Sequence, residues 1–157
     1  MKTWYRMSSP VGDLLLVAED GKLLEIGFIN GRHAVQPPPD AREDRAPFAA
    51  TIRQLEEYFA GRRKTFDLPL APRGTEFQRR VWSALQKIPY GKTVAYADIA
   101  QRIGNPKGVR AVGLANGRNP IPIVIPCHRV IGKNGALTGY GGGLPIKQKL
   151  LEIEGVL

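Results

Sequence analysis

Three short apolar runs near the start of the chain predict β-strands. They cover residues 4–8, 14–18 and 23–28 and are rich in residues that favour strands. Turn residues separate the runs, and the Asp20-Gly21 pair between the second and the third is a strong signal for a tight hairpin. The pattern therefore predicts a three-stranded antiparallel meander.

A loop and one helix are predicted after the strands. Residues 30–46 contain three consecutive prolines and many charges, so they are expected to form a loop. Beyond them, apolar residues recur at helical spacing until Gly61, which supplies a stop. This apolar stripe consists of Phe48, Ile52, Leu55 and Phe59. No side chain in this half suggests catalytic chemistry.

The chain becomes helical after residues 71–74, which are predicted to be a linker. Thr75 and Gln78 fit a capping box at the start of the first helix. The protein is therefore predicted to be α+β. A small N-terminal domain with an antiparallel sheet is expected at residues 1–72, and a mainly helical C-terminal domain at residues 73–157.

Two short helices in the second domain have the arrangement of a helix-turn-helix motif. The first is predicted over residues 94–103, and the second ends near Ala115. Gly104 supplies the turn between them. Asn105 is expected to cap the second helix, with Pro106 at its first position.

Composition is that of a soluble globular protein: of 157 residues, 43% are hydrophobic and 24% are charged. No apolar run approaches the ~18 residues of a membrane span, so no membrane association is expected. The first residues carry no apolar stretch behind their charges, which predicts no signal peptide and a cytoplasmic location. The single cysteine, Cys127, excludes an intramolecular disulfide and a multi-cysteine zinc site.

Positive charge is concentrated in the second half of the chain, whose net charge overall is +9. Residues 1–74 carry 11 Lys or Arg and 10 Asp or Glu, whereas residues 75–157 carry 12 and 4. An excess confined to one half indicates a surface that binds a polyanion, most commonly nucleic acid. A solvated basic face without a partner gives the same charge count.

The second helix of the motif has few side chains that can reach a DNA base. Residues 107–115 are mostly small, and Arg110 is the only long basic side chain after Lys107. A reader of the major groove needs several long polar side chains. The composition therefore favours close, sequence-independent binding with Arg110 free to enter the duplex. The alternative is that the small residues serve only helix packing.

The densest chemistry surrounds Cys127. Three prolines in residues 120–126 forbid a helix and stiffen the segment that leads to it. His128 and Arg129 follow directly, and such cationic neighbours are expected to lower the thiol pKa from about 8.5 towards the physiological range. Because the thiolate is the form that attacks an electrophile, Cys127 is the candidate nucleophile.

Residues 126–130, Pro-Cys-His-Arg-Val, resemble the active-site signature of the O6-alkylguanine-DNA alkyltransferases, also called methylated-DNA–protein-cysteine methyltransferases. The resemblance covers most of residues 75–157 in order and spacing. Its further matches are Tyr96, Asn105-Pro106-Lys107, Arg110-Ala111-Val112-Gly113, Asn119-Pro120, Gly139-Tyr140 and Leu151-Glu152-Ile153-Glu154-Gly155. The first domain is similar only in its predicted strands and helix, and the family implies a ribonuclease-H-like fold for it.

The resemblance implies a DNA-repair reaction in which an alkyl group, methyl or larger, moves from O6 of guanine to the protein's cysteine. Alkylated O4 of thymine is an expected second substrate. The damaged base must leave the stack, at a cost of a few kcal/mol, and the transfer is irreversible, once per molecule. The resemblance also implies no cofactor, no metal, a monomeric protein, and double-stranded DNA containing alkylated guanine as the partner.

The family pattern gives each matching residue a role. Cys127 is the nucleophile, His128 is its base through a water, and Glu154 holds the imidazole tautomer. Asn119 organises the turn, and Tyr96 helps to rotate the phosphate and donates a proton to the purine ring.

The same pattern implies the DNA contacts and the pocket. Arg110 fills the space left by the flipped base, and further DNA contacts are expected from Tyr96, Ala97, Asn105, Lys107 and Lys133. The alkylguanine pocket is expected from Val130, Tyr140 and Gly141. Some members carry a serine in place of Gly141, so this pocket is expected to be more open. The cysteines that bind structural zinc in some N-terminal domains are absent.

Two other functions are compatible with the residues alone. A helix-turn-helix module that only binds DNA would not need Cys127, and the family's alkyltransferase-like relatives lack the cysteine that this chain keeps. A cysteine hydrolase using Cys127 and His128 would turn over repeatedly on esters or peptides, and the basic second half gives that function no support.

Overall fold

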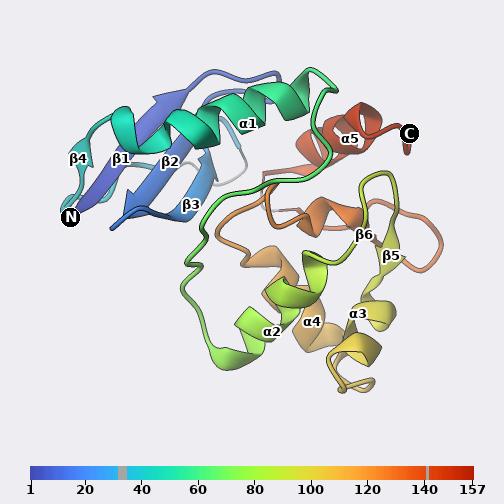
Figure 1. Cartoon of the computed structure of the whole chain (residues 1–157). Helices are drawn as coiled ribbons and strands as arrows, with labels where there is room; N and C mark the ends of the chain where they lie inside the picture. The colour runs from blue at the N-terminus through green and yellow to red at the C-terminus, as the bar shows by residue number, and fades with distance from the viewer. Residues whose placement is uncertain (32–34, 141) are drawn as a thin grey trace.

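The N-terminal half is built on the predicted meander (Figure 1). The structure is a computed structural model that describes residues 1–31, 35–140 and 142–157. Antiparallel strands follow one another in the order in which they occur along the chain, namely β1 (Lys2–Met7), β2 (Leu14–Glu19) and β3 (Lys22–Phe28). Asp20 and Gly21 have φ values of 51° and 81°, which are the positive values that a type I′ hairpin turn requires.

A fourth strand corrects the expectation that residues 30–46 form only a loop. Strand β4 (Arg42–Glu43) pairs in parallel with β1, so the sheet is mixed, in the order β3-β2-β1-β4. The sequence pattern does not reveal this strand because it has two residues, both exposed and charged. The strand is defined only by its hydrogen-bonded pairing with β1.

Helix α1 (Ala49–Phe59), preceded by the short helix η1 (Ala46–Phe48), lies across one face of this sheet (Figure 1). Its residues Ile52 and Leu55 are buried in the main hydrophobic cluster. Gly61 has a φ of 75°, a conformation that glycine adopts readily beyond a helix end. The predicted helix and its stop are therefore both present.

Three helices of the C-terminal half pack against one another. Helix α2 (Glu76–Leu85) begins with the predicted capping box, in which Thr75 and Gln78 exchange hydrogen bonds. Helices α3 (Tyr96–Arg102) and α4 (Val109–Gly117) form the helix-turn-helix and pack on α2.

The start of α4 differs from the prediction. Asn105 does not cap the helix, because its carbonyl accepts from the Gly108 N–H (2.9 Å) and closes a β-turn with Pro106 inside it. Gly108 is the N-cap, and α4 begins at Val109. A Cβ atom at Gly108 would lie 2.5 Å from the Asn105 amide nitrogen, so a larger residue there would displace the Asn105 side chain.

A two-stranded parallel ladder places the cysteine segment beside the helix-turn-helix. Strand β5 (Val94–Ala95), directly before α3, pairs with β6 (Val130–Ile131). The short helix η2 (Cys127–Arg129) ends where β6 begins, and α5 (Leu144–Ile153) completes the chain.

The two halves share one hydrophobic cluster. Strand β3 also joins them through its outer edge, where the Ile26 N–H donates to the Pro120 carbonyl (2.9 Å). The Leu23 N–H donates to the Pro69 carbonyl (2.9 Å), and the Leu23 carbonyl accepts from the Ala71 N–H (2.9 Å). Among the described residues, no helix has the length and apolar character needed to cross a membrane.

Candidate active site

The turn that leads to Cys127 is held by a single amide side chain. Asn119 Oδ1 accepts from the Ile121 N–H (3.0 Å), and Asn119 Nδ2 donates to the Ile125 carbonyl (2.8 Å). Between these two anchors, the buried Ile123 has a φ of 75°, which is unusual for a β-branched residue. Asn119 thus fixes a strained turn whose end is the cysteine.

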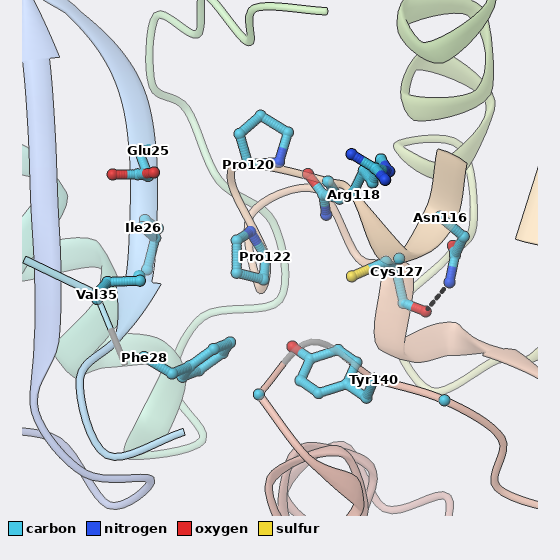
Figure 2. Close-up of a pocket in the computed structure, with 15 residues that line it drawn as sticks. Glu25, Ile26, Phe28, Val35, Asn116, Arg118, Pro120, Pro122, Cys127 and Tyr140 are labelled. Carbon is cyan, nitrogen blue, oxygen red and sulfur yellow. Dashed lines mark hydrogen bonds between the residues drawn. The ribbon is translucent and has the colours of Figure 1, made fainter. Parts of the chain in front are cut away.

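Cys127 borders a pocket of about 280 Å³ that is lined by both halves of the chain (Figure 2). The sulfur points into it, towards Pro122. Tyr140 covers one side, where its ring packs against that of Phe28 (5.8 Å between centroids), and Ile26 of β3 lies across the pocket from Cys127. The thiol is almost fully buried, with 4% of the residue exposed.

Behind the cysteine, His128 and Glu154 form a buried pair. The distance from His128 Nε2 to Glu154 Oε2 is 2.6 Å, and both side chains are fully buried. Arg129 donates to the two oxygens of the same carboxylate, from Nε at 2.8 Å and from Nη2 at 3.1 Å. Its third nitrogen, Nη1, donates to the Ile88 carbonyl (2.7 Å).

These contacts fix the protonation of the pair. Burial alone would raise the pKa of Glu154, but the hydrogen bonds from His128, Arg129 and Tyr58 lower it to about 2. Burial lowers the pKa of His128 in spite of the opposing effect of Glu154. The imidazole is therefore neutral at pH 7, with its proton on Nε2, because a carboxylate can only accept.

The nitrogen that remains is suited to act as a base. His128 Nδ1 is buried and has no hydrogen-bond partner within the described part of the chain. The resulting order of groups, a thiol, an imidazole and a carboxylate, is that of a nucleophile, a base and the residue that orients the base.

The structure corrects the expectation that neighbouring cations lower the thiol pKa. His128 Nε2 and the Arg129 guanidinium both make their hydrogen bonds to Glu154, whose charge balances that of the guanidinium. Burial dominates and raises the pKa of Cys127 to about 11, although the Asn119 side chain and the charge of Lys147 oppose this rise. The resting thiol is therefore protonated at neutral pH.

Two buried polar residues that the sequence analysis missed lie next to this site. Lys147 donates to the carbonyls of Val130 (2.7 Å) and Thr138 (2.8 Å), and burial lowers its pKa to about 8. Asn116 lines the pocket, and its amide nitrogen is 3.5 Å from the Cys127 carbonyl (Figure 2). The burial of Lys147 could have been predicted from the sequence. It precedes Leu150 and Leu151 by three and four residues, so helical spacing places it on the buried face of α5.

The structure brings only some of the predicted site residues to the pocket itself. Asn119, Cys127 and Tyr140 line it, and the Tyr140 hydroxyl is buried with no partner among the described side chains and backbone. Val130 is buried in β6 and is not part of the lining. Gly141 lies outside the described residues.

The predicted DNA contacts lie on the helix-turn-helix and on one loop. Tyr96, at the start of α3, is half-buried, and its hydroxyl lies 2.9 Å from Thr138 Oγ1. The other predicted contacts are all exposed: Ala97, Asn105, Lys107, Arg110 and Lys133. On α4, Arg110 stands beside exposed small and apolar residues, including Leu114 at 65% exposure. Among the described residues, no three His, Cys, Asp or Glu side chains gather as metal ligands would.

Two domain families match the chain in succession. Residues 3–72 match the 6-O-methylguanine DNA methyltransferase, ribonuclease-like domain. Residues 76–156 match the 6-O-methylguanine DNA methyltransferase, DNA binding domain.

The chain is also similar over nearly its whole length to individual proteins. It is 54% identical to the methylated-DNA–protein-cysteine methyltransferase of Methanosarcina acetivorans over 147 residues, which are 94% of each chain. It is 46% identical to the constitutive one of Bacillus subtilis over 160 residues, which cover 98% of this chain and 96% of the relative. A crystal structure of Mycobacterium tuberculosis OGT in complex with DNA superimposes with a TM-score of 0.91 at 46% identity, covering 97% of this chain and 92% of that one.

Proposed function

Because the chain belongs to the methylated-DNA–protein-cysteine methyltransferase family, we propose that Cys127 is the residue that receives the alkyl group. The protein repairs O6-methylguanine in DNA, as that family does. One observation supports the assignment above all others. The only cysteine of the chain borders a pocket, and the next residue in the sequence, His128, is paired with the buried Glu154.

The buried thiol needs a base, since its pKa of about 11 keeps it protonated at neutral pH. We assign that role to His128 Nδ1, acting through a water, with Glu154 stabilising the imidazolium that forms. The sulfur attacks the methyl carbon, the bond from that carbon to O6 breaks, and its electron pair stays on the purine. The purine then takes up a proton, for which Tyr96 is the proposed donor, so that the products are a thioether and guanine.

The pocket suits a flipped base with a substituent on O6. Its wall opposite Cys127 contains the apolar side chains of Ile26 and Phe28 beside Glu25, and Tyr140 covers one side. We propose that alkyl groups larger than methyl, and O4-alkylated thymine, are accepted there. A thioether is stable in water, so each molecule is expected to act once.

The helix-turn-helix is the proposed surface for double-stranded DNA that contains alkylated guanine. The relative from Mycobacterium tuberculosis was solved in complex with DNA, which supports DNA binding by this chain. Helix α4 offers Arg110 beside small residues, so we propose that the helix approaches the duplex closely and that Arg110 fills the space of the flipped base. A single chain holds every group that this account uses, and we propose that it acts as a monomer.

Arg110→Ala separates base flipping from chemistry. Without the inserted side chain, the vacated stack is not filled, so the rate of methyl transfer from duplex DNA is expected to fall about a hundredfold, as a few kcal/mol of flipping cost predicts. Transfer from free O6-methylguanine base, which needs no flipping, is expected to stay within about twofold. Release of unmethylated guanine from each substrate measures both rates.

Arg102→Ala is the matched control, since it removes an exposed arginine from the preceding helix of the motif. It should retain duplex repair. An equal loss on duplex and free base in Arg110→Ala would contradict the proposed role of Arg110, and no transfer by the unmodified protein would contradict the proposed function as a whole.

A further inference from the structure

We infer that Tyr58, in helix α1 of the N-terminal half, is a positioning residue for the Glu154–His128 pair. The ribonuclease-like half of the chain would then take part in the chemistry of Cys127 as well as supporting the fold. This inference rests on the proposed function, in which His128 is the base for Cys127.

The contact is short, buried and made between the two halves. The Tyr58 hydroxyl donates to Glu154 Oε2 at 2.6 Å, across 96 residues of sequence. His128 Nε2 lies 2.6 Å from the same oxygen. The Tyr58 ring is fully buried. Its centroid lies 5.5 Å from that of Phe66 and 6.3 Å from that of Tyr90, and these rings leave it little freedom to turn.

Three groups meet at Glu154 Oε2, namely the Tyr58 hydroxyl, His128 Nε2 and Arg129 Nη2 (3.1 Å). The other groups that face Glu154 are His128 and Arg129 from η2 and the backbone N–H of Gly91, 3.4 Å from Oε1. The Tyr90 hydroxyl lies nearby but donates to the Ile153 carbonyl (3.2 Å). Among the described residues, Tyr58 is the only donor to Glu154 from the N-terminal half.

Tyr58 remains a donor throughout the reaction. Burial and the neighbouring Glu154 charge raise the pKa of its hydroxyl far above the usual value for tyrosine. Its hydrogen bond draws electron density from Oε2, the atom that stabilises a proton on His128. Removing the hydroxyl would leave a more basic carboxylate, and this would raise the pKa of His128.

The expected consequence lies in the pH dependence of repair. His128 must be neutral to take the proton of Cys127, so repair slows as His128 becomes protonated at low pH. If Tyr58→Phe raises the pKa of His128, this acidic limb moves to higher pH. A tyrosine that only filled space would lower the rate equally at every pH.

The experiment compares Tyr58→Phe with Tyr90→Phe in the full chain. The control makes the same chemical change on a neighbouring ring whose hydroxyl does not contact Glu154. Methyl transfer from a duplex containing O6-methylguanine is measured from about pH 5 to pH 9. The protonation of His128 is followed by NMR in the same variants, and the chain's two histidines are distinguished with His128→Gln.

In Tyr58→Phe we expect transfer at neutral pH to fall about tenfold, the size of effect that loss of a hydrogen bond to a charged group produces. We expect the acidic limb and the His128 titration to move together to higher pH, while Tyr90→Phe leaves both in place. An unchanged His128 titration with a uniform loss of rate would overturn the inference.

A measurement on the unmodified protein tests the same contact even if Tyr58→Phe does not fold. A hydroxyl proton held in a buried bond exchanges slowly with water, so the Tyr58 hydroxyl should give an NMR signal with a contact to the His128 ring. Absence of that signal would also overturn the inference. If the unmodified protein transferred no methyl group, the proposed function would fail, while the NMR measurements would still decide whether Tyr58 holds the pair.

Discussion

Replacing Cys127 by serine is expected to abolish methyl transfer from DNA to the protein while leaving DNA binding unchanged. A hydroxyl is a far weaker acid and nucleophile than a thiol, and the chain has no second cysteine to take over the reaction. The helix-turn-helix lies on other elements, so its contacts with DNA do not depend on the sulfur. Transfer is measured with a methylated duplex, and binding with the same duplex at fixed salt.

This variant also separates the function proposed here from the two alternatives. A module that only binds DNA would lose nothing in Cys127→Ser, and the unmodified protein would leave O6-methylguanine intact. A cysteine hydrolase would release many product molecules per chain from ester or peptide substrates. Either result would contradict the assignment of Cys127 as the alkyl acceptor.

Arg129→Met is expected to destabilise the fold by about 3–5 kcal/mol, because it leaves the Glu154 carboxylate buried without its guanidinium partner. For a chain of this length, such a loss corresponds to a melting temperature lower by about 10 °C. Arg63→Met is the control, since Arg63 forms an ion pair of the same 2.8 Å length with Glu57 on a partly exposed surface. Solvent screens that pair, so Arg63→Met is expected to leave the melting temperature nearly unchanged, and similar losses in the two variants would contradict the prediction.

The pH dependence of stability gives a second readout for Arg129. The pKa of Glu154 is lowered to about 2, so its ionised form stabilises the fold above the unfolded-state pKa of about 4.3. In the unmodified protein this contribution is lost only as pH falls from about 4 towards 2. Arg129→Met raises the pKa of Glu154, and its acid unfolding should therefore begin at a higher pH.

Local signals in the sequence predicted most of the fold. Asp20-Gly21 fixed the hairpin, because few other residue pairs adopt two positive φ values. Thr75 and Gln78 marked the start of α2, because both partners of a capping box lie within one turn. Such features need no information from the rest of the chain.

Features that depend on distant contacts escaped prediction or were predicted wrongly. Strand β4, for example, exists only through its pairing with β1. The thiol pKa was predicted in the wrong direction because the sequence does not reveal that Cys127 is buried or that Arg129 pairs with Glu154.

The candidate site was predicted unevenly for the same reason. Cys127 and His128 stand out in the sequence by their chemistry, whereas Glu154 was expected only from the family resemblance. Tyr58 gives no local signal, since it matters only after α1 packs against the C-terminal half and brings its hydroxyl to Glu154. Buried networks made by two halves of a chain are visible only in the folded structure.

The most direct test of the central claim is the mass of the intact protein after incubation with excess duplex that contains O6-methylguanine. The account predicts a gain of one methylene unit per chain, located by peptide mapping on Cys127, with guanine restored in equal amount. A gain at another residue, no gain at all, or more guanine restored than protein present would contradict it.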